Sequence, residues 1–294
     1  HIGGLLDQDG KEAENIYSFA EDSDGRIWVA SMGNGLFCLD PVSGKVTRIP
    51  SDKVHNNWIT SLHHSPSNRL YVGTYDGVGY LELSGDSMAG KWLSTREIVY
   101  SIHEDNAGRL WLGTDEGLHL LDPRNGEDML LNVDDGLPNN AVYAVCGDAD
   151  GDIWTSSNSG LSRYSVTDGR FVNYYYSDGL QGNEFTKGAS FRDNGGNLWF
   201  GGTNGVTWFN PKEITVPHKI WTPRITGLYV DGIPVRMGMK SGSRYMIDSP
   251  VEDTERIDLG YSQNSLSVEF SALELNSPER LQWQYRLGGN WMTL

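Results

Sequence analysis

The chain has 294 residues, of which 38% are hydrophobic and 11% aromatic, a composition that excludes a disordered protein. Its formal net charge of −16 argues against nucleic acid or an anionic membrane surface as a partner, since both are bound through clusters of Lys and Arg. The 36 Gly and 11 Pro residues favour many short strands joined by tight turns, and therefore an all-β protein.

The chain begins at His1, without Met and without the charged and apolar regions of a secretion signal. No stretch approaches the roughly 20 apolar residues that a membrane span needs. We therefore interpret the chain as a mature or excised fragment of a longer protein.

Five similar segments recur between residues 15 and 211: EDSDGRIWVAS, HSPSNRLYVGT, EDNAGRLWLGT, GDADGDIWTSS and RDNGGNLWFGG. An aromatic residue occupies the same place in each of them, at Trp28, Tyr71, Trp111, Trp154 and Trp199. Their successive separations are 43, 40, 43 and 45 residues, which is the period of a four-stranded β-propeller blade. The repeat therefore predicts five four-stranded blades.

Residues at two further positions of the repeat recur with the same spacing. Ten residues before each aromatic stands a small residue, at Ser18, Ser61, Ser101, Ala144 and Ala189. Three residues before it stands a turn residue, at Gly25, Asn68, Gly108, Gly151 and Gly196. The small residues belong to apolar alternations that predict innermost strands at 16–20, 59–63, 99–103 and 142–146.

The remaining strands of each blade follow from the same alignment. The aromatic segments predict second strands, packed between neighbouring blades. Third strands are expected at 35–40, 117–122 and 205–210, and fourth strands at 46–50, 128–132 and 171–175.

These repeats resemble the regulator propeller of hybrid two-component sensors, whose blades read roughly I-x-S-I-x-E-D-x-x-G-x-L-W-x-G-T-x-x-G-L. The third repeat, Val99 to Leu118, matches that pattern almost throughout. Propellers of that family usually have seven blades. The resemblance therefore implies that residues 15–211 are part of a larger ring and that residues 1–14 are a remnant of a preceding blade or a linker.

A second β domain is expected after the repeats end at Asn210-Pro211. A linker at 212–222 precedes an alternating segment with Asp231-Gly232 in a hairpin position. Two further strand patterns, 266–275 and 281–294, are bridged by residues 276–279. Residues 223–294 predict a β-sandwich and resemble the Y_Y_Y Ig-like domain that follows the propellers of the same sensors, although its closing strands are missing after Leu294.

No residue group predicts a metal, a cofactor or catalysis. Asp22-x-Asp24-Gly25 and Asp148-x-Asp150-Gly151 resemble calcium loops but lack the full series of oxygen ligands, so their acids are expected to cap turns. His63 and His64 are adjacent on a strand and point to opposite faces. Cys38 and Cys146 fall on different blades and are expected to be small core residues rather than a disulfide.

Strand order predicts where a ligand would bind. In an up-and-down blade, the turn after strand two and the crossover from strand four to the next blade lie on one face, opposite the Asp-x-x-Gly turns. Amides, carboxylates and aromatics gather there, as hydroxyl-rich ligands require. The candidate ligand-binding residues are Asn56, Asn57, Trp58, Tyr75, Asp76, Asp115, Glu116, Asn139, Asn140, Asn158, Asn183, Glu184, Phe185 and Asn204.

The resemblance implies that the chain binds oligosaccharides in the periplasm as part of a membrane-anchored receptor. The signal would pass through a homodimer of Ig-like domains and one membrane helix to a cytoplasmic histidine kinase. Two alternatives stay open: a propeller lyase or glycosidase that uses Glu116 or Glu184, and a scaffold whose acidic face binds a basic protein.

Overall fold

The computed structural model describes residues 6, 10, 12–83, 89–93, 96–214, 222–272, 283–286, 288–289 and 291–293. It divides into two compact units, mainly residues 1–215 and 216–292. Nearly all regular structure in the described residues is β, as expected; the short α1 (Ser51–Val54) is an exception. None of the helices found in these residues combines the length and the hydrophobicity that crossing a membrane requires.

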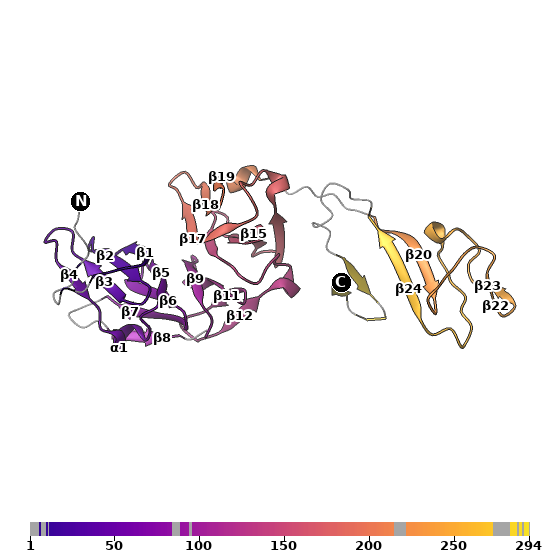
Figure 1. Cartoon of the computed structure of the whole chain (residues 1–294), viewed down its shortest axis with the longest axis horizontal. Helices are drawn as coiled ribbons and strands as arrows, with labels where there is room; N and C mark the ends of the chain where they lie inside the picture. The colour runs from indigo at the N-terminus through magenta and orange to yellow at the C-terminus, as the bar shows by residue number, and fades with distance from the viewer. Residues whose placement is uncertain are drawn as a thin grey trace. The chain divides into compact units, whose positions relative to one another are not determined.

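The first unit is a succession of antiparallel sheets in which the strands pair in chain order (Figure 1). The first two sheets are β1 (Ile16–Glu21), β2 (Ile27–Ser31), β3 (Gly35–Leu39), β4 (Val46–Arg48), then β5 (Ile59–His64), β6 (Arg69–Thr74), β7 (Gly77–Glu82), β8 (Ala89–Trp92). The next two are β9 (Val99–Glu104), β10 (Leu110–Thr114), β11 (Leu118–Leu121), β12 (Asp128–Leu131), then β13 (Ala144–Gly147), β14 (Ile153–Ser157), β15 (Gly160–Ser165), β16 (Arg170–Tyr174).

A fifth sheet consists of β17 (Phe185–Arg192), β18 (Leu198–Gly202) and β19 (Gly205–Phe209). The all-β propeller architecture is thus confirmed. The prediction of four strands in every blade is wrong for the fifth sheet as far as the structure describes it. After β19, Asn210 caps the short 3-10 helix η3 (Pro211–Glu213), in which Pro cannot donate to a sheet ladder.

The first strand of each blade is the innermost, as the small-residue column predicted. First strands of successive blades contact one another: β1 with β5, β5 with β9, β9 with β13, and β13 with β17. The Ser18 hydroxyl accepts the N–H of Leu62, and the Ser101 hydroxyl accepts that of Val145. A Cβ atom added to Gly113 would lie 2.7 Å from the carbonyl oxygen of Val142. Larger side chains at Ser18, Ser101 or Gly113 would separate the blades.

The aromatic of the second strand lies in the core between blades in the first four blades, whereas Trp199 of the fifth is partly exposed and stacks on Trp208. Trp28, Tyr71, Trp111 and Trp154 are at most 1% exposed. Trp28 shares one apolar cluster with residues of both the first and the second blade, including Ile59 and Leu70. Burying a large aromatic at each blade junction supplies much of the hydrophobic stabilisation of the unit.

An aspartate closes the turn between the first two strands of four blades. In the first blade, the Asp22 carboxylate accepts the backbone N–H groups of Asp24 and Arg26, each at 3.0 Å, and the indole N–H of Trp28 at 2.8 Å. Burial raises the pKa of Asp22, but these bonds and the Arg26 guanidinium outweigh it, and the net pKa is lowered. Asp22 and Asp148 are therefore turn caps, as predicted, whereas Asp24 forms an ion pair with Arg26.

Asp22→Ala is expected to lower the free energy of unfolding by about 3 kcal/mol, because it removes several hydrogen bonds to a buried charged group. Asp24→Ala is the matched control. Asp24 lies in the same turn and also binds Arg26, but its side chain is 67% exposed, whereas that of Asp22 is fully buried. The control should cost less than about 1 kcal/mol. Urea unfolding followed by tryptophan fluorescence measures both, and equal losses would contradict this role of Asp22.

The contribution of the Asp22 charge should depend on pH in a defined direction. Because the folded pKa lies below the ordinary value of 3.8, its stabilisation is complete above that value and is lost as pH falls through the folded pKa. The stability difference between the wild type and Asp22→Asn should therefore be constant near neutral pH and shrink below pH 3.8. Urea titrations of both proteins from pH 7 downward would test this, and a difference that grows on acidification would refute it.

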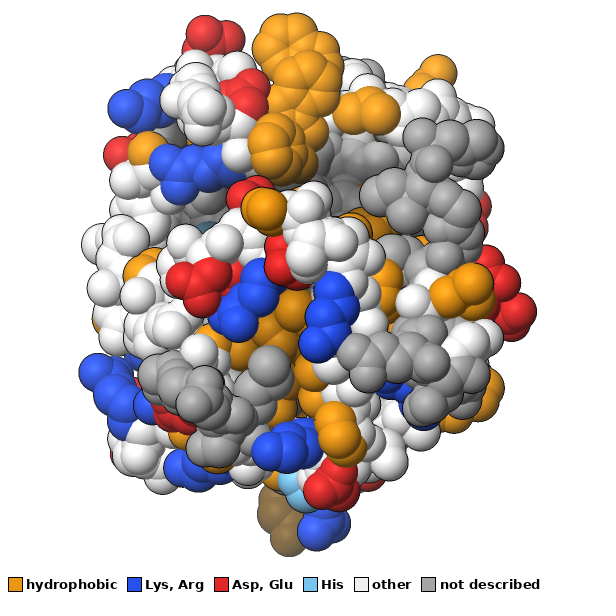
Figure 2. Space-filling view, turned by 90° about the vertical axis from the view of Figure 1, so that its left-hand side faces the viewer, with side chains coloured by type: hydrophobic (Ala, Val, Ile, Leu, Met, Phe, Trp, Pro, Cys, Tyr) orange, Lys and Arg blue, Asp and Glu red, His pale blue; other side chains and the backbone are white. Residues whose placement is uncertain are grey.

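The fifth blade exposes an apolar face. Phe191, Val206 and Trp208 are 64%, 57% and 59% exposed. Their counterparts in the fourth blade include Cys146 and Leu161, which are buried against the fifth. Figure 2 shows hydrophobic side chains gathered at its upper edge, the side on which Figure 1 places β18 and β19. Such a face fits the expectation of a larger ring, which stays a prediction.

The second unit contains β20 (Arg224–Val230), β21 (Ile233–Pro234), β22 (Lys240–Ser241), β23 (Arg244–Tyr245), the 3-10 helix η4 (Val251–Asp253), β24 (Leu266–Ser271), β25 (Gln284–Arg286) and β26 (Trp291–Thr293). The hairpin at Asp231-Gly232 is confirmed: both residues have positive φ, 51° and 79°, and join β20 to β21. Strand β20 also pairs with β24. The predicted bridge at 276–279 lies outside the described residues, and the Ig-like sandwich stays a prediction.

Candidate functional site

Crossovers between blades and the turns after second strands are joined into one face, as strand order predicted. We call this the crossover face. The N–H groups of Gly33 and Gly35, in the first blade, donate to the carbonyl of Asn57 in the following crossover. The Gly160 N–H likewise donates to the carbonyl of Asn183 at 2.7 Å. These backbone bonds fix the crossovers beside the turns and give the face a rigid frame.

An exposed aromatic pair stands on this face. Trp58 and Tyr75 are 51% and 41% exposed, and their ring centroids lie 5.6 Å apart at an interplanar angle of 65°. The Tyr75 N–H donates to the Trp58 carbonyl, and the Asn56 side-chain oxygen accepts the Trp58 N–H at 2.8 Å. Both backbones are therefore held in place while the rings remain open to solvent.

Several predicted residues present polar side chains around the face. Asp76, Glu116, Asn158, Glu184 and Asn204 are exposed on the turns and crossovers. The crossover into the fifth blade reaches the turn of that blade, since the Gln181 side-chain oxygen accepts the Asn204 N–H at 2.8 Å. The structure thus brings acids and amides to the same face as the aromatic pair.

Other predicted residues use their polar atoms to hold the loops. The Asn140 side-chain oxygen accepts the N–H of Val133 at the start of the 3-10 helix η1 (Val133–Asp135). Asn183 does the same for Tyr176 at the start of η2 (Tyr176–Asp178). Asn139 caps a turn through Ala141, and the Asp115 carboxylate accepts the Ile98 N–H at 2.8 Å. The polar atoms of these four side chains are therefore used in hydrogen bonds that hold the loops.

Two residues differ further from the prediction. Phe185 is 3% exposed and packs edge-on against Phe200 in the apolar core, so it does not belong to the ligand-accessible surface. The sequence could not separate a buried from an exposed aromatic at the start of a strand. Asn57 is half-buried; its side-chain oxygen has no hydrogen-bond partner within the described residues and lies beneath Gly35.

Asn140→Ala should lower the free energy of unfolding by about 1 kcal/mol, because the Val133 N–H loses its acceptor. Asn158→Ala is the control on an exposed turn of the same face, where the change should stay within about 0.5 kcal/mol. Urea unfolding curves of the two variants decide between them. If Asn140→Ala is as stable as the wild type, this side chain has no role in holding its loop.

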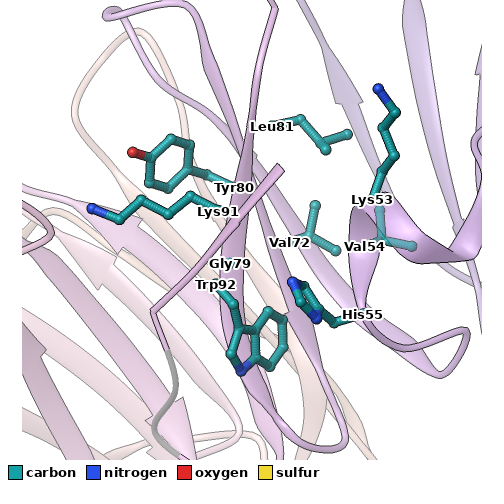
Figure 3. Close-up of a pocket in the computed structure, with 9 residues that line it drawn as sticks. All are labelled: Lys53, Val54, His55, Val72, Gly79, Tyr80, Leu81, Lys91 and Trp92. Atoms are coloured by element: carbon teal, nitrogen blue, oxygen red, sulfur yellow. The ribbon is translucent and has the colours of Figure 1, made fainter. Parts of the chain in front are cut away.

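A hollow of about 180 Å³, a volume that includes space open to solvent, lies in the second blade beneath α1. Figure 3 shows His55 beside Trp92 at one end of it, and their ring centroids are 5.2 Å apart. Ligand pockets usually enclose at least about 300 Å³, so we interpret the hollow as a packing gap. Its lining residues are Lys53, Val54, His55, Val72, Gly79, Tyr80, Leu81, Lys91 and Trp92.

On the opposite side of the blades, His63 and His64 contact different partners. His63 Nε2 lies 3.4 Å from a carboxylate oxygen of Glu104 in the next blade, whereas His64 approaches Asn68. Burial lowers the pKa of His103 to about 4, with the neighbouring His63 as a second cause. No group of three or more potential metal ligands occurs among the residues that the structure describes.

Cys38 and Cys146 are free, buried thiols on β3 and β13, as expected for small core residues. Burial raises the pKa of Cys146 to about 11, which keeps the thiol protonated and unreactive near neutral pH.

Sequence reasoning missed one cluster at the inner strands, formed by Tyr100, Tyr143 and Lys187. The Lys187 ammonium lies 4.1 Å from the Tyr100 ring centroid. A signal was available, because the fifth repeat is longer than the fourth and Lys187-Gly188 falls in the extra length.

Comparison with known families decides the nature of the repeats. Residues 10–33, 93–116 and 136–159 match the family described as two component regulator propeller. The chain contains two-component regulator propeller repeats. The regulator propeller pattern suggested by the sequence is therefore confirmed in the first, third and fourth repeats.

Similar proteins include a histidine kinase and the extracellular domain of a two-component system. Histidine kinase P4 of Formosa agariphila is 23% identical over 290 residues, which are 94% of this chain and 21% of that protein. The extracellular domain of the hybrid two-component system BT3049 from B. thetaiotaomicron has a TM-score of 0.62 and 25% identity, over 95% of this chain and 38% of that domain. This chain thus spans about a fifth of the length of the kinase.

More distant structures share the fold. The extracellular domain of the hybrid two-component system BT4673 from B. thetaiotaomicron has a TM-score of 0.57 at 21% identity, over 74% of this chain and 31% of that one. Virginiamycin B lyase from Staphylococcus aureus has a TM-score of 0.50 at 17% identity, over 73% of this chain and 74% of the lyase. At these identities the likeness concerns the propeller fold and carries no activity to this chain.

Proposed function

We propose that this chain is the extracytoplasmic ligand-sensing region of a two-component receptor and that it detects oligosaccharides released from polysaccharides. The observation that carries the proposal is the exposed Trp58–Tyr75 pair, held on the crossover face of a regulator propeller. Similarity to extracellular domains of two-component systems supports the sensing role.

The chemistry of the face suits a sugar. The apolar face of a pyranose ring packs against an aromatic ring, and its hydroxyls need donors and acceptors arranged around that ring. Trp58 and Tyr75 supply the rings, and the exposed side chains of Asp76 and Glu116 supply acceptors on neighbouring turns. Since the backbone of the pair is already fixed by hydrogen bonds, binding would require little ordering of the protein.

Signalling would use parts of the receptor on both sides of the membrane. We place the propeller in the periplasm, anchored through a membrane helix to a cytoplasmic histidine kinase. The second unit, as a partial Y_Y_Y Ig-like domain, would form a homodimer that couples the two. A ligand shifts such an equilibrium only by the difference in its affinity for the two dimer arrangements.

Trp58→Ala is expected to weaken oligosaccharide binding about tenfold, because it removes the larger ring of the pair. Isothermal titration calorimetry of the whole chain against a library of neutral and acidic oligosaccharides identifies a ligand and then compares the variant with the wild type. Tyr261→Ala is the control, since this tyrosine is fully exposed in the second unit. Its affinity should equal that of the wild type.

Absence of binding by the wild-type chain to every library member at millimolar concentration would overturn the proposal. Equal affinities of Trp58→Ala and the wild type would leave sensing but remove this site. Shortened or unsaturated products in the calorimeter cell would instead indicate a glycosidase or a lyase. Glu116→Gln and Glu184→Gln would then show which exposed acid contributes.

A further inference from the structure

The first strands of the first, second, third and fifth blades share an irregularity at the crossover face. The pairing register shifts between Ile16 and Ser18, between Ile59 and Ser61, and opposite Val99–Ser101. A bulge leaves one residue outside the ladder and redirects its side chain. The bulged positions are Tyr17, Thr60 and Tyr100, all at the entry of an innermost strand. The propeller therefore presents a repeated set of redirected side chains near its axis.

The fifth blade enlarges this irregularity. Its register shift extends from Phe185 to Ser190, because the spacing between the aromatics of the fourth and fifth repeats is 45 rather than 43 residues. Gly188 has a φ of +69°, and its N–H donates to the Tyr143 carbonyl at 2.8 Å. This bond fixes the bulge against the inner strand of the fourth blade and determines where the adjacent Lys187 lies.

Lys187 is held by two aromatic rings. Its ammonium lies 4.1 Å from the ring centroid of Tyr100 and 5.4 Å from that of Tyr143. The two rings meet edge to face, with centroids 5.8 Å apart and an interplanar angle of 87°. Tyr100 is almost buried, Tyr143 is half-buried and Lys187 is exposed. The rings of two blades therefore form a platform, and the ammonium from a third blade lies over it and faces solvent.

The cluster carries one positive charge, that of the Lys187 ammonium. The protein carries a net charge of −16, and yet Lys187 has no carboxylate within ion-pair distance among the described residues. An ammonium has three N–H donors. Contact with the ring faces leaves donors free for an anion, and the cation–π contacts position the ammonium without neutralising it.

We propose that Lys187, Tyr100 and Tyr143 bind the carboxylate of an acidic sugar, a hexuronate, at the axial end of the crossover face. This inference rests on the proposed oligosaccharide-sensing function and specifies its ligand class. The lysine binds the carboxylate, and the exposed part of Tyr143 contacts the sugar ring. A single positive charge in an acidic protein suits one carboxylate, whereas a polyanion would be repelled by the surrounding surface.

The test uses methyl β-D-glucuronide and the uncharged methyl β-D-glucoside as probes. Each is titrated into the whole chain carrying isotope-labelled tyrosine, and NMR reports the ring signals, which Tyr100→Phe and Tyr143→Phe assign. The glucuronide should shift the Tyr143 signals in a saturable manner and bind at least about tenfold more tightly than the glucoside, the difference expected from one charge-assisted hydrogen bond.

Lys187→Met should abolish that preference, and Lys187→Arg should retain most of it. Lys45→Met removes one positive charge from the exposed β3–β4 turn and should leave the preference unchanged, which separates local binding from net charge. Thermal unfolding of each variant shows whether it remains folded. If Lys187→Met lowers stability and the wild type has no preference for the glucuronide, the lysine merely ties the fifth blade to the axis and the inference is overturned.

Different results would contradict the hexuronate site and the oligosaccharide-sensing function. Binding of neutral oligosaccharides with equal affinity by the wild type and Lys187→Met, with no effect of the glucuronide on Tyr143, would remove the hexuronate site and leave the sensing function intact. Failure of every oligosaccharide and of both glycosides to bind would remove both. Glucuronide shifts at Tyr75 instead of Tyr143 would place the acidic sugar at the other aromatic site and also overturn the inference.

Discussion

The bond between a turn aspartate and the tryptophan of the second strand is the interaction on which the blades depend. It occurs at Asp22–Trp28, Asp105–Trp111, Asp148–Trp154 and Asp193–Trp199, with distances from 2.8 to 3.3 Å. A buried indole needs an acceptor for its N–H. The same carboxylate also accepts backbone N–H groups of the turn, so one side chain both closes the hairpin and orients the tryptophan, which packs between blades at Trp28, Trp111 and Trp154.

The second blade lacks the aspartate, and its turn is stabilised by other hydrogen bonds. Ser65 stands at the turn position, and Tyr71 replaces the tryptophan. The Ser65 hydroxyl donates to Glu104 of the third blade at 3.0 Å, and His63 approaches the same carboxylate. Burial raises the pKa of Glu104, but the bonds from His63 and Ser65 outweigh it, and the net pKa is lowered. A carboxylate from the neighbouring blade thus supplies the charge that the turn lacks.

The sequence was sufficient for the blades because each strand carries several constraints that recur at a fixed spacing. A small residue at Ser101, a turn glycine at Gly108 and an aromatic at Trp111 each have one structural reason, and together they define register. The candidate face followed from strand order alone. The roles of its residues did not, because an asparagine that binds a ligand and one that accepts a loop N–H, such as Asn140, look the same in sequence. Phe185 was misassigned for a similar reason, since its burial depends on Phe200 from another strand.

The turn aspartates and the proposed recognition face therefore occupy opposite ends of the same strands. At one end, the turn aspartates accept hydrogen bonds from backbone and indole N–H groups, so substitutions there lower the stability of the fold. At the other, the crossovers are fixed through their backbones, as between Gly160 and Asn183, so that side chains such as Trp58 and Tyr75 contribute little to the fold. A repeat can vary at this end without losing its register. The two additional residues before Ser190 are such a variation, because the ladder of β17 and β18 resumes unchanged after the bulge that carries Lys187.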